Sequence, residues 1–337
     1  MTTTRGRHID LKAAPPIPGL HARAFAGVSD YEDLAELFCA ANTYDDVPWQ
    51  PTAENIRLEM DGADGADPVD DVVIVEVDGR VVAASGVERK VRDDVPTYEV
   101  WGSVEPASRR RGIGTSLMGW NLGRVRVRAT REEPLIPVDV AAFCDDQEAG
   151  HRAVIAAAGF EPVRHFFLMR RIGLDDVPDA PLPDGLEIRR VTEDRWRAIF
   201  DAENEAFRDH WGHHEMTEHQ YRATFNRAEL DTDLWVVAWD GDEVAGVVQN
   251  WVWPEENERL GVKRGWLEHI SVRRPWRRRG LARAITAASL IKFREAGLDE
   301  AMLGVDSENV NGALGLYEGL GFAVFNRASA YRRRLER

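Results

Sequence analysis

Six consecutive residues late in the chain, Arg277-Arg278-Arg279-Gly280-Leu281-Ala282, have the composition of an anion-binding turn. Gly280 has no Cβ, so an anion can approach the backbone closely at this position. The turn follows an apolar run at Leu267, Ile270 and Val272 and precedes a helical pattern of apolar residues. The sequence therefore predicts a strand, a turn and a helix N-terminus. The first N–H groups of a helix have no intrahelical partner and bind phosphate groups.

The same pattern occurs earlier in the chain, at Arg109-x-x-Gly112-x-Gly114. Two further features recur in the same order, an Asp-Gly turn between two apolar runs and a closing Gly-Phe pair. The separations are 162 residues for Asp78 and Asp240, 168 for Arg109 and Arg277, and 162 for Phe160 and Phe322. Such regular spacing indicates an internal duplication.

Proline and acidic residues between the two copies mark a boundary. Residues 175–185 have neither helical nor strand periodicity, and their prolines favour an extended linker. We therefore expect one domain over 19–174 and a second over 186–337, each of ordinary domain size. Residues 1–18 are polar and carry prolines, and we expect them to form a flexible tail.

The overall charge of the chain restricts the classes of molecule that it is expected to bind. Lys and Arg number 43 and Asp and Glu 58, a net charge of −15, which argues against general binding of nucleic acid or an anionic membrane. No apolar run of transmembrane length and no signal peptide is recognisable. The only cysteines, Cys39 and Cys144, fall in separate predicted elements, so a disulfide framework is not expected. We expect a cytoplasmic protein, and the oligomeric state is not predicted.

The two turns resemble the pyrophosphate loop of the GNAT acetyltransferase superfamily, Gln or Arg, two residues, Gly, one residue, then Gly or Ala. Residues 309–322 strengthen the match, because they resemble the last helix of that family and its closing Leu-Gly-Phe, here Leu320-Gly321-Phe322. The resemblance implies an α/β fold of two tandem GNAT domains. Each would be a mixed, mostly antiparallel sheet flanked by helices.

The resemblance also implies acetyl-CoA as co-substrate. The backbone of Ile270, Ser271 and Val272 would pair with the pantetheine arm, and the turn from Arg277 to Arg283 would surround the pyrophosphate. Asn309 or Asn311 would supply the family's asparagine contact, with Asn309 preferred. In the first half, the cofactor-binding residues would be Arg109, Gly112 and Gly114.

Transfer of an acetyl group from a thioester needs a proton for the leaving thiolate, because a free thiol has a pKa of about 8.5. Tyr317 stands five residues before Phe322, where related GNAT enzymes place such an acid, and Ile155 occupies the corresponding position before Phe160. Ile155 has no proton to donate. We therefore expect catalysis in the second half and a degenerate first half.

The general base is expected on the strand that enters the second turn. Strict alternation would put Glu268 on one face with Ile270 and Val272, and His269 on the other face. The family's glutamate usually lies two residues earlier, where this chain has Trp266. Glu268 is the preferred base or substrate anchor, and His269 and a water molecule are alternatives.

The segment after the first helix of a GNAT domain usually lines the acceptor site. In the second half this makes Asp209, His210 and Trp211 the expected substrate residues. Zinc is an alternative for the histidines at 210, 213 and 214 with Glu215, but Gly212 interrupts helical spacing and no H-E-x-x-H pattern is present. No metal is expected.

These observations predict an acetyl-CoA-dependent N-acetyltransferase that acts on a primary amine of a small molecule. The alternative is a non-catalytic acyl-CoA-binding sensor or regulatory protein. Binding of acetyl-CoA without turnover would distinguish the non-catalytic sensor from the N-acetyltransferase.

Overall fold

The computed structural model describes residues 6–62, 67–92, 95–133, 136–213, 215–308 and 312–335. Asn309, Asn311 and His214, which the sequence singled out, lie outside these ranges. Residue contacts divide the chain into two compact units. Unit 1 runs to Arg164 and takes in the chain from Ala328 onward, and unit 2 comprises His165–Arg327.

Unit 1 contains a sheet with the strand order β1-β2-β3-β4-β5-β12. Its strands are Leu20–Ala24 (β1), Val72–Val77 (β2), Arg80–Arg92 (β3), Val95–Val104 (β4), Asp139–Asp145 (β5) and the end of Ala323–Arg334 (β12). Its helices are Val28–Asp45 (α1), Ala53–Gly62 (α2), Pro68–Asp71 (α3), Ile113–Glu132 (α4) and Ala149–Ala157 (α5).

Alternate side chains of these strands face opposite layers of helices, as the period of two requires. Val73 and Val75 pack with Leu117 of α4, whereas Val72 and Ile74 pack with residues of α1 and α2. Helices α1 and α2 therefore cover one face of the sheet, and α4 covers the other.

The expected N-terminal tail is wrong for residues 6–18. Ile9 and Leu11 are buried in the same cluster as Ala22 and Ala24, and the Ile9 N–H donates to the Ala22 carbonyl. Burying these two side chains stabilises the segment, and prolines at 15, 16 and 18 do not prevent its packing.

Unit 2 repeats this arrangement with the strand order β6-β11-β10-β9-β8-β7. Its strands are the end of Glu161–Ile172 (β6), Glu187–Arg189 (β7), Val236–Asp240 (β8), Glu243–Trp251 (β9), Arg264–Val272 (β10) and Glu300–Asp306 (β11). Its helices are Trp196–Phe207 (α6), Glu218–Phe225 (α7), Pro254–Leu260 (α8), Leu281–Glu295 (α9) and Ala313–Glu318 (α10). Residues of α6 and α7 pack on one face, and residues of α9 and α10 on the other.

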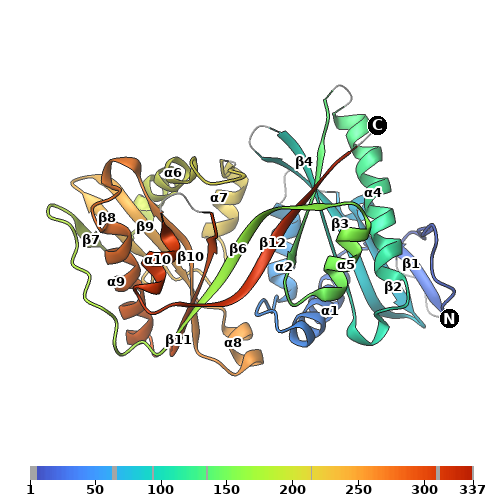
Figure 1. Ribbon diagram of the computed structural model, residues 1–337, viewed down its shortest axis with the longest axis horizontal. Coiled ribbons are helices and arrows are strands. Elements are labelled where there is room, and N and C mark those ends of the chain that lie inside the picture. Colours follow the sequence, from blue (N-terminus) through green and yellow to red (C-terminus); the bar gives the residue numbers. More distant parts are fainter. Residues whose placement is uncertain are drawn as a thin grey trace. The chain divides into compact units, whose positions relative to one another are not determined.

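The two halves of the sequence exchange their last strands. Strand β6 ends the first half, but its residues 166–172 pair antiparallel with β11 of unit 2. Strand β12 ends the second half, but its residues 328–334 pair antiparallel with β5 of unit 1. Figure 1 shows these two long strands in yellow-green and red. The contact boundaries at 164 and 327 therefore differ from the predicted linker at 175–185, because sheet pairing assigns β6 and β12 to units that the sequence order does not suggest.

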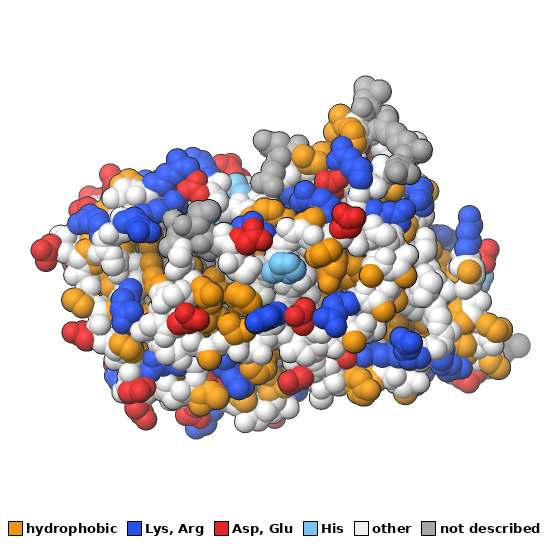
Figure 2. All heavy atoms as spheres, in the orientation of Figure 1, with side chains coloured by type: hydrophobic (Ala, Val, Ile, Leu, Met, Phe, Trp, Pro, Cys, Tyr) orange, Lys and Arg blue, Asp and Glu red, His pale blue; other side chains and the backbone are white. Residues whose placement is uncertain are grey.

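Arginine side chains at the surface are commonly paired with carboxylates, for example Arg80 with Glu105 and Arg190 with Asp233. Figure 2 shows basic and acidic side chains interspersed over the face that it presents. Among the described residues drawn there, the charges on this face alternate in sign over short distances.

Candidate active site

The two glycine turns have matching backbone conformations. Each follows a short 3-10 helix, Pro106–Ser108 in unit 1 and Arg274–Trp276 in unit 2. Arg110 has φ 61° and Gly112 has φ 90°, and the corresponding values in unit 2 are 63° for Arg278 and 88° for Gly280. Neither glycine provides a side-chain cap for the helix that follows. The first N–H groups of α4 and α9 are therefore left for an anion, and the positive helix end favours one.

The first arginine of each turn supports the turn from behind. Arg109 Nε donates to the Val104 carbonyl at 2.9 Å, and its terminal nitrogens bind both oxygens of Asp45 at 2.7 Å. Arg277 Nε donates likewise to the Val272 carbonyl at 2.9 Å. Both guanidinium groups thus tie the turn to the preceding strand, and they are already engaged by protein groups.

Asp209 holds the turn of unit 2 rather than standing free in a substrate pocket. Its carboxylate accepts hydrogen bonds from Arg274 at 3.0 Å and from Arg277 at 2.5 Å. The hydrogen bonds from these two arginines keep the pKa of Asp209 far below its ordinary value, so the carboxylate is charged at neutral pH. Arg277 also donates to the Ala206 carbonyl near the end of α6, which joins this helix to the turn.

Parallel strands separate beside each turn. In unit 1, β4 pairs with β5 over Thr97–Glu99, and in unit 2, β10 pairs with β11 over Arg264–Trp266. Within the described residues both pairs of strands then run on without pairing to each other. The edge of β10 that faces β11 therefore has unpaired backbone groups from Leu267 onward, including Ile270, Ser271 and Val272. An extended amide-bearing ligand can hydrogen-bond to such an edge.

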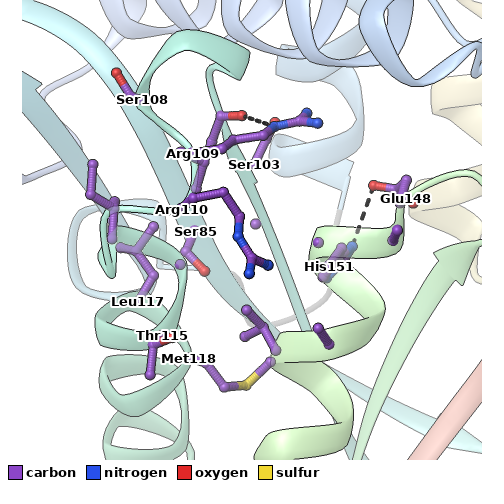
Figure 3. Close-up of a pocket in the computed structure, with 18 of the residues that line it drawn as sticks. Ser85, Ser103, Ser108, Arg109, Arg110, Thr115, Leu117, Met118, Glu148 and His151 are labelled. Carbon is purple, nitrogen blue, oxygen red and sulfur yellow. Dashed lines mark hydrogen bonds and ion pairs between the residues drawn. The ribbon is translucent and has the colours of Figure 1, made fainter.

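In unit 1 the separation of the strands opens into a cavity of about 780 Å³. It is lined by β4 from Val100 to Val104, by the glycine turn and the first turns of α4, and by residues 147–157 before and within α5. Figure 3 shows Arg110 reaching into this cavity, with His151 and Glu148 on the α5 side. A cavity of this size accepts a large nucleotide-containing ligand.

Strand β10 contains a bulge at Glu268 that is absent from the paired region of β4. Its pairing with β9 shifts register between Leu267 and His269, whereas β3 and β4 pair residue by residue from Ala83 with Val104 to Arg92 with Val95. The extra residue breaks the alternation, so the face expected for Glu268 is wrong, whereas His269 faces away from Ile270 and Val272 as expected. Ile270 and Val272 pack with the α9 cluster, while Glu268 lies near Trp253 and Arg227 on the α6 and α7 side.

Glu268 keeps contact with solvent, but the surrounding protein atoms desolvate its carboxyl group and raise its pKa. The nearby charge of His269 and a hydrogen bond from Trp253 oppose this effect without cancelling it. A carboxyl group with a raised pKa is a better match to proton transfer near neutral pH than an ordinary surface glutamate.

His269 is backed by a fully buried carboxylate. Its Nδ1 lies 3.5 Å from Oε1 of Glu203 on α6, and Gln249 of β9 donates to the other oxygen of Glu203. Burial alone would lower the pKa of His269, but the nearby negative charge of Glu203 outweighs this effect and raises the pKa. The imidazole is 40% exposed, so one side of the ring remains accessible.

Tyr317 lies in the short helix α10 and packs edge-on against Phe322, with ring centroids 6.1 Å apart. Burial raises the pKa of its phenol, so the hydroxyl keeps its proton at neutral pH. In unit 1, Ile155 of α5 is fully buried in the apolar core and carries no hydroxyl group.

Comparison with known proteins fits this geometry. Residues 196–322 match the model of the Acetyltransferase (GNAT) family. A mycothiol acetyltransferase of Salinispora arenicola (strain CNS-205) is 30% identical over 284 residues, which cover 80% of this chain and 89% of that protein. The chain belongs to the GNAT acetyltransferase family.

Solved structures agree with a tandem GNAT architecture. A GCN5-related N-acetyltransferase from Sphaerobacter thermophilus superposes with a TM-score of 0.71 at 26% identity, over 94% of this chain and 96% of that chain. A tandem GNAT protein from the clavulanic acid biosynthesis pathway has a TM-score of 0.65 at 18% identity, over 94% and 98% of the chains, and supports the fold. As a member of this family, the protein transfers an acetyl group from acetyl-CoA to an amine.

The other two predicted substrate residues of the acetyltransferase lie near α6. The His210 ring is 4.4 Å from the Phe207 ring, which is in turn 5.5 Å from His269. Burial, aided by the charge of Arg277, lowers the pKa of His210. Trp211 packs 6.1 Å from Phe166 of β6. The structure thus brings His210 toward the strand that carries His269, and it places Trp211 beside β6.

Sequence reasoning missed a polar cluster in unit 1. Cys144, Glu148 and His151 place a thiol, a carboxylate and an imidazole within 4.8 Å of one another, a set that could hold a metal ion. Burial raises the pKa of Cys144, and its thiol donates to the Asp145 carbonyl at 3.3 Å. The spacing Cys-x-x-x-Glu-x-x-His was visible in the sequence, but only the turn before α5 brings the groups together.

Within the described residues, no helix is long and apolar enough to span a membrane.

Proposed function

We propose that unit 2 catalyses the acetyl transfer and that unit 1 is a degenerate copy that holds acyl-CoA without turning it over. The bulge at Glu268 is the observation that carries this proposal. A bulge leaves one residue outside the ladder, and its N–H can then point to the oxygen of a reacting carbonyl. Strand β4 of unit 1 is paired without such an interruption. The last helix of unit 1, α5, has Ile155 at the position that Tyr317 occupies in unit 2.

In the proposed reaction the neutral amine attacks the carbonyl carbon of the thioester, and its nitrogen loses a proton to Glu268, directly or through water. The carbon–sulfur bond then breaks. The leaving thiolate receives a proton from Tyr317, which gives free coenzyme A and the acetylated amine. The raised pKa of Glu268 suits it to accept a proton near neutral pH, and the raised pKa of Tyr317 keeps its proton in place until the thiolate forms.

His269 is the second candidate for the base. The buried carboxylate of Glu203 orients its ring and stabilises the imidazolium that proton uptake would create. Glu268 is preferred because it occupies the bulge itself, beside the unpaired edge of β10. The two candidates differ in the pH dependence that their loss should produce.

The acceptor that we propose to test first is a mycothiol-type amine, because the relatives are named mycothiol acetyltransferases. His210 and Trp211 are proposed to contribute to the acceptor site. Asp209 is assigned instead to support of the pyrophosphate turn, with Gly280 and the N–H groups of Leu281, Ala282 and Arg283 nearest the diphosphate. The exposed side chains of Arg278 and Arg279 would add positive charge there. We also propose a cytoplasmic location and a reaction without metal.

Free-thiol release from acetyl-CoA, measured over a panel of primary amines, tests this function. Tyr317→Phe is expected to lower kcat by about 10²-fold or more, since general acid catalysis contributes roughly 10² to 10⁴. Tyr331→Phe removes a hydroxyl from β12 of unit 1 and is the matched control. Full activity of Tyr317→Phe with an unchanged pH profile would reject the acid assignment. Acetyl-CoA binding without thiol release for every amine would favour the non-catalytic sensor.

A further inference from the structure

A second cavity in unit 1, of about 300 Å³, lies on the face of the sheet covered by α1 and α2. Three aromatic residues line it, Phe38 of α1, Trp49 after α1, and Trp101 of β4. We call this cavity the aromatic pocket. Trp101 also lines the larger glycine-turn cavity, so the two cavities adjoin at this residue.

The aromatic side chains are arranged around the pocket at steep angles to one another. The Phe38 ring is 5.4 Å from Trp49 with an interplanar angle of 59°, and 5.8 Å from Trp101 with an angle of 53°. The three rings line one pocket from α1, the segment after α1 and β4. The π faces of aromatic rings attract cations.

Gly86 on β3 fixes the position of the Trp101 indole. A Cβ built on Gly86 would lie 2.4 Å from an indole carbon, which is closer than atoms can approach. The bare backbone of this residue, paired with Trp101 across the two strands, therefore seats the ring flat on the sheet. The aromatic wall is built into the strand pair and does not depend on a flexible side chain.

The polar lining of the aromatic pocket is acidic. Glu59, Asp67, Asp71 and Glu88 line it, and none of the described lining residues is Lys, Arg or His. Asp71 is neutralised by Arg124 at 2.7 Å and Arg128 at 2.5 Å. Glu88 shares Lys90 with Glu99, at 3.1 Å and 2.8 Å from the ammonium group. Arg92 also pairs with Glu99, so Lys90 and Arg92 together balance Glu88 and Glu99. The exposed carboxylates of Glu59 and Asp67 add to the acidic lining.

We propose that the aromatic pocket binds a small organic ammonium ion. The rings of Phe38, Trp49 and Trp101 would contact its alkyl groups and charge, and Glu59 and Glu88 would supply the opposite charge. The pocket can be reached from solvent, because Trp49 is 40% exposed and Glu59 is also exposed. Its volume suits a ligand at the small end of the range for bound metabolites.

The two units differ in chemistry at the position of Trp101. The residue 168 positions after Trp101 is His269, so the duplicated half places an imidazole where unit 1 has the indole. The inference does not depend on the proposed catalytic residues of unit 2. It gives the half without a catalytic tyrosine a ligand of its own.

Calorimetric titration of the full chain with choline tests the proposal, in the absence of acetyl-CoA. The probe for comparison is 3,3-dimethylbutan-1-ol, in which carbon replaces the charged nitrogen. Choline is expected to bind at least about tenfold more tightly than the alcohol, because the two molecules differ mainly in charge and ring contacts favour the cation. Equal affinity for the two probes, or no saturable binding of choline, would overturn the inference.

Substitutions in the aromatic pocket test whether choline binds there. Trp49→Ala is expected to weaken choline binding by about tenfold and Glu88→Gln by about threefold, as loss of a cation–π contact and of a partly screened charge predict. Phe143→Ala removes an exposed aromatic side chain of β5 and serves as the matched control. Choline binding that survives Trp49→Ala unchanged would place the ligand elsewhere. Because Tyr317→Phe is expected to leave this titration unaltered, failure of the catalytic proposal and failure of this one are distinguishable.

Discussion

Arg109 binds both carboxylate oxygens of Asp45 at 2.7 Å, and Arg277 binds one oxygen of Asp209 at 2.5 Å in unit 2. In both units the same arginine also donates to the carbonyl of a strand valine, Val104 or Val272. The duplication therefore preserved a support for the phosphate turn as well as the turn itself.

Loss of this support should weaken cofactor binding. Asp209→Asn is expected to destabilise unit 2 by about 1 kcal/mol, because the ion pairs are partly solvent-screened, and to raise the KM for acetyl-CoA by about fivefold. Thermal unfolding and steady-state kinetics measure the two effects. Asp45→Asn is the matched control, since it should perturb the turn of unit 1 and leave the KM of unit 2 near its original value.

The positive φ of Gly280 gives a second prediction. Gly280→Ala forces a Cβ into a left-handed conformation at a cost of about 1–2 kcal/mol, although no atom lies within 4 Å of the built Cβ. We expect weaker acetyl-CoA binding by calorimetry. Gly119→Ala lies within α4, also with open space and without a positive φ, and should stabilise the protein by about 0.5–1 kcal/mol. Equal effects of the two substitutions would contradict the strained-turn explanation.

Glu268→Gln tests the proposed base through its pH profile. The raised pKa of Glu268 means that wild-type activity should fall as pH decreases through that value, because the protonated carboxyl cannot accept a proton. The variant should lose about 10²-fold in kcat and lack this acidic limb. If the limb persists at full rate, another group is the base.

Glu203→Gln separates the role of His269. Glu203 raises the pKa of His269, so the imidazolium stabilises the fold below the ordinary histidine value, and this contribution disappears as pH rises through the raised pKa. The variant should lower the His269 pKa, which an NMR titration of its ring protons can follow. Glu218→Gln, at an exposed ion pair of α7, is the control. An unchanged His269 titration in Glu203→Gln would show that the buried carboxylate does not govern this ring.

Local sequence signals predicted the parts of the site that depend on a glycine in a turn and on the start of a helix. Gly112 and Gly280, each before an amphipathic helix, were sufficient to indicate the turns and their repetition. The bulge at Glu268 was not predictable, because one extra residue in a strand leaves the apolar pattern almost unchanged while it reverses the faces that follow. This is why the expected separation of Glu268 from His269 was wrong.

Features that join distant positions were also missed. Phe38, Trp49 and Trp101 form one pocket only after α1 packs on β4, and their spacing carries no periodicity. The burial of Ile9 and Leu11 was hidden by a polar, proline-bearing composition. Asp209 was predicted to be a substrate residue, and its partners at positions 274 and 277 could be identified only from the folded chain.

The crossing of β6 and β12 has a consequence for biosynthesis. The edge of β5 is completed by residues 328–334, which leave the ribosome long after β5 itself. The N-terminal half therefore cannot reach its final form during translation, and an N-terminal fragment cut at the linker should expose this edge and aggregate.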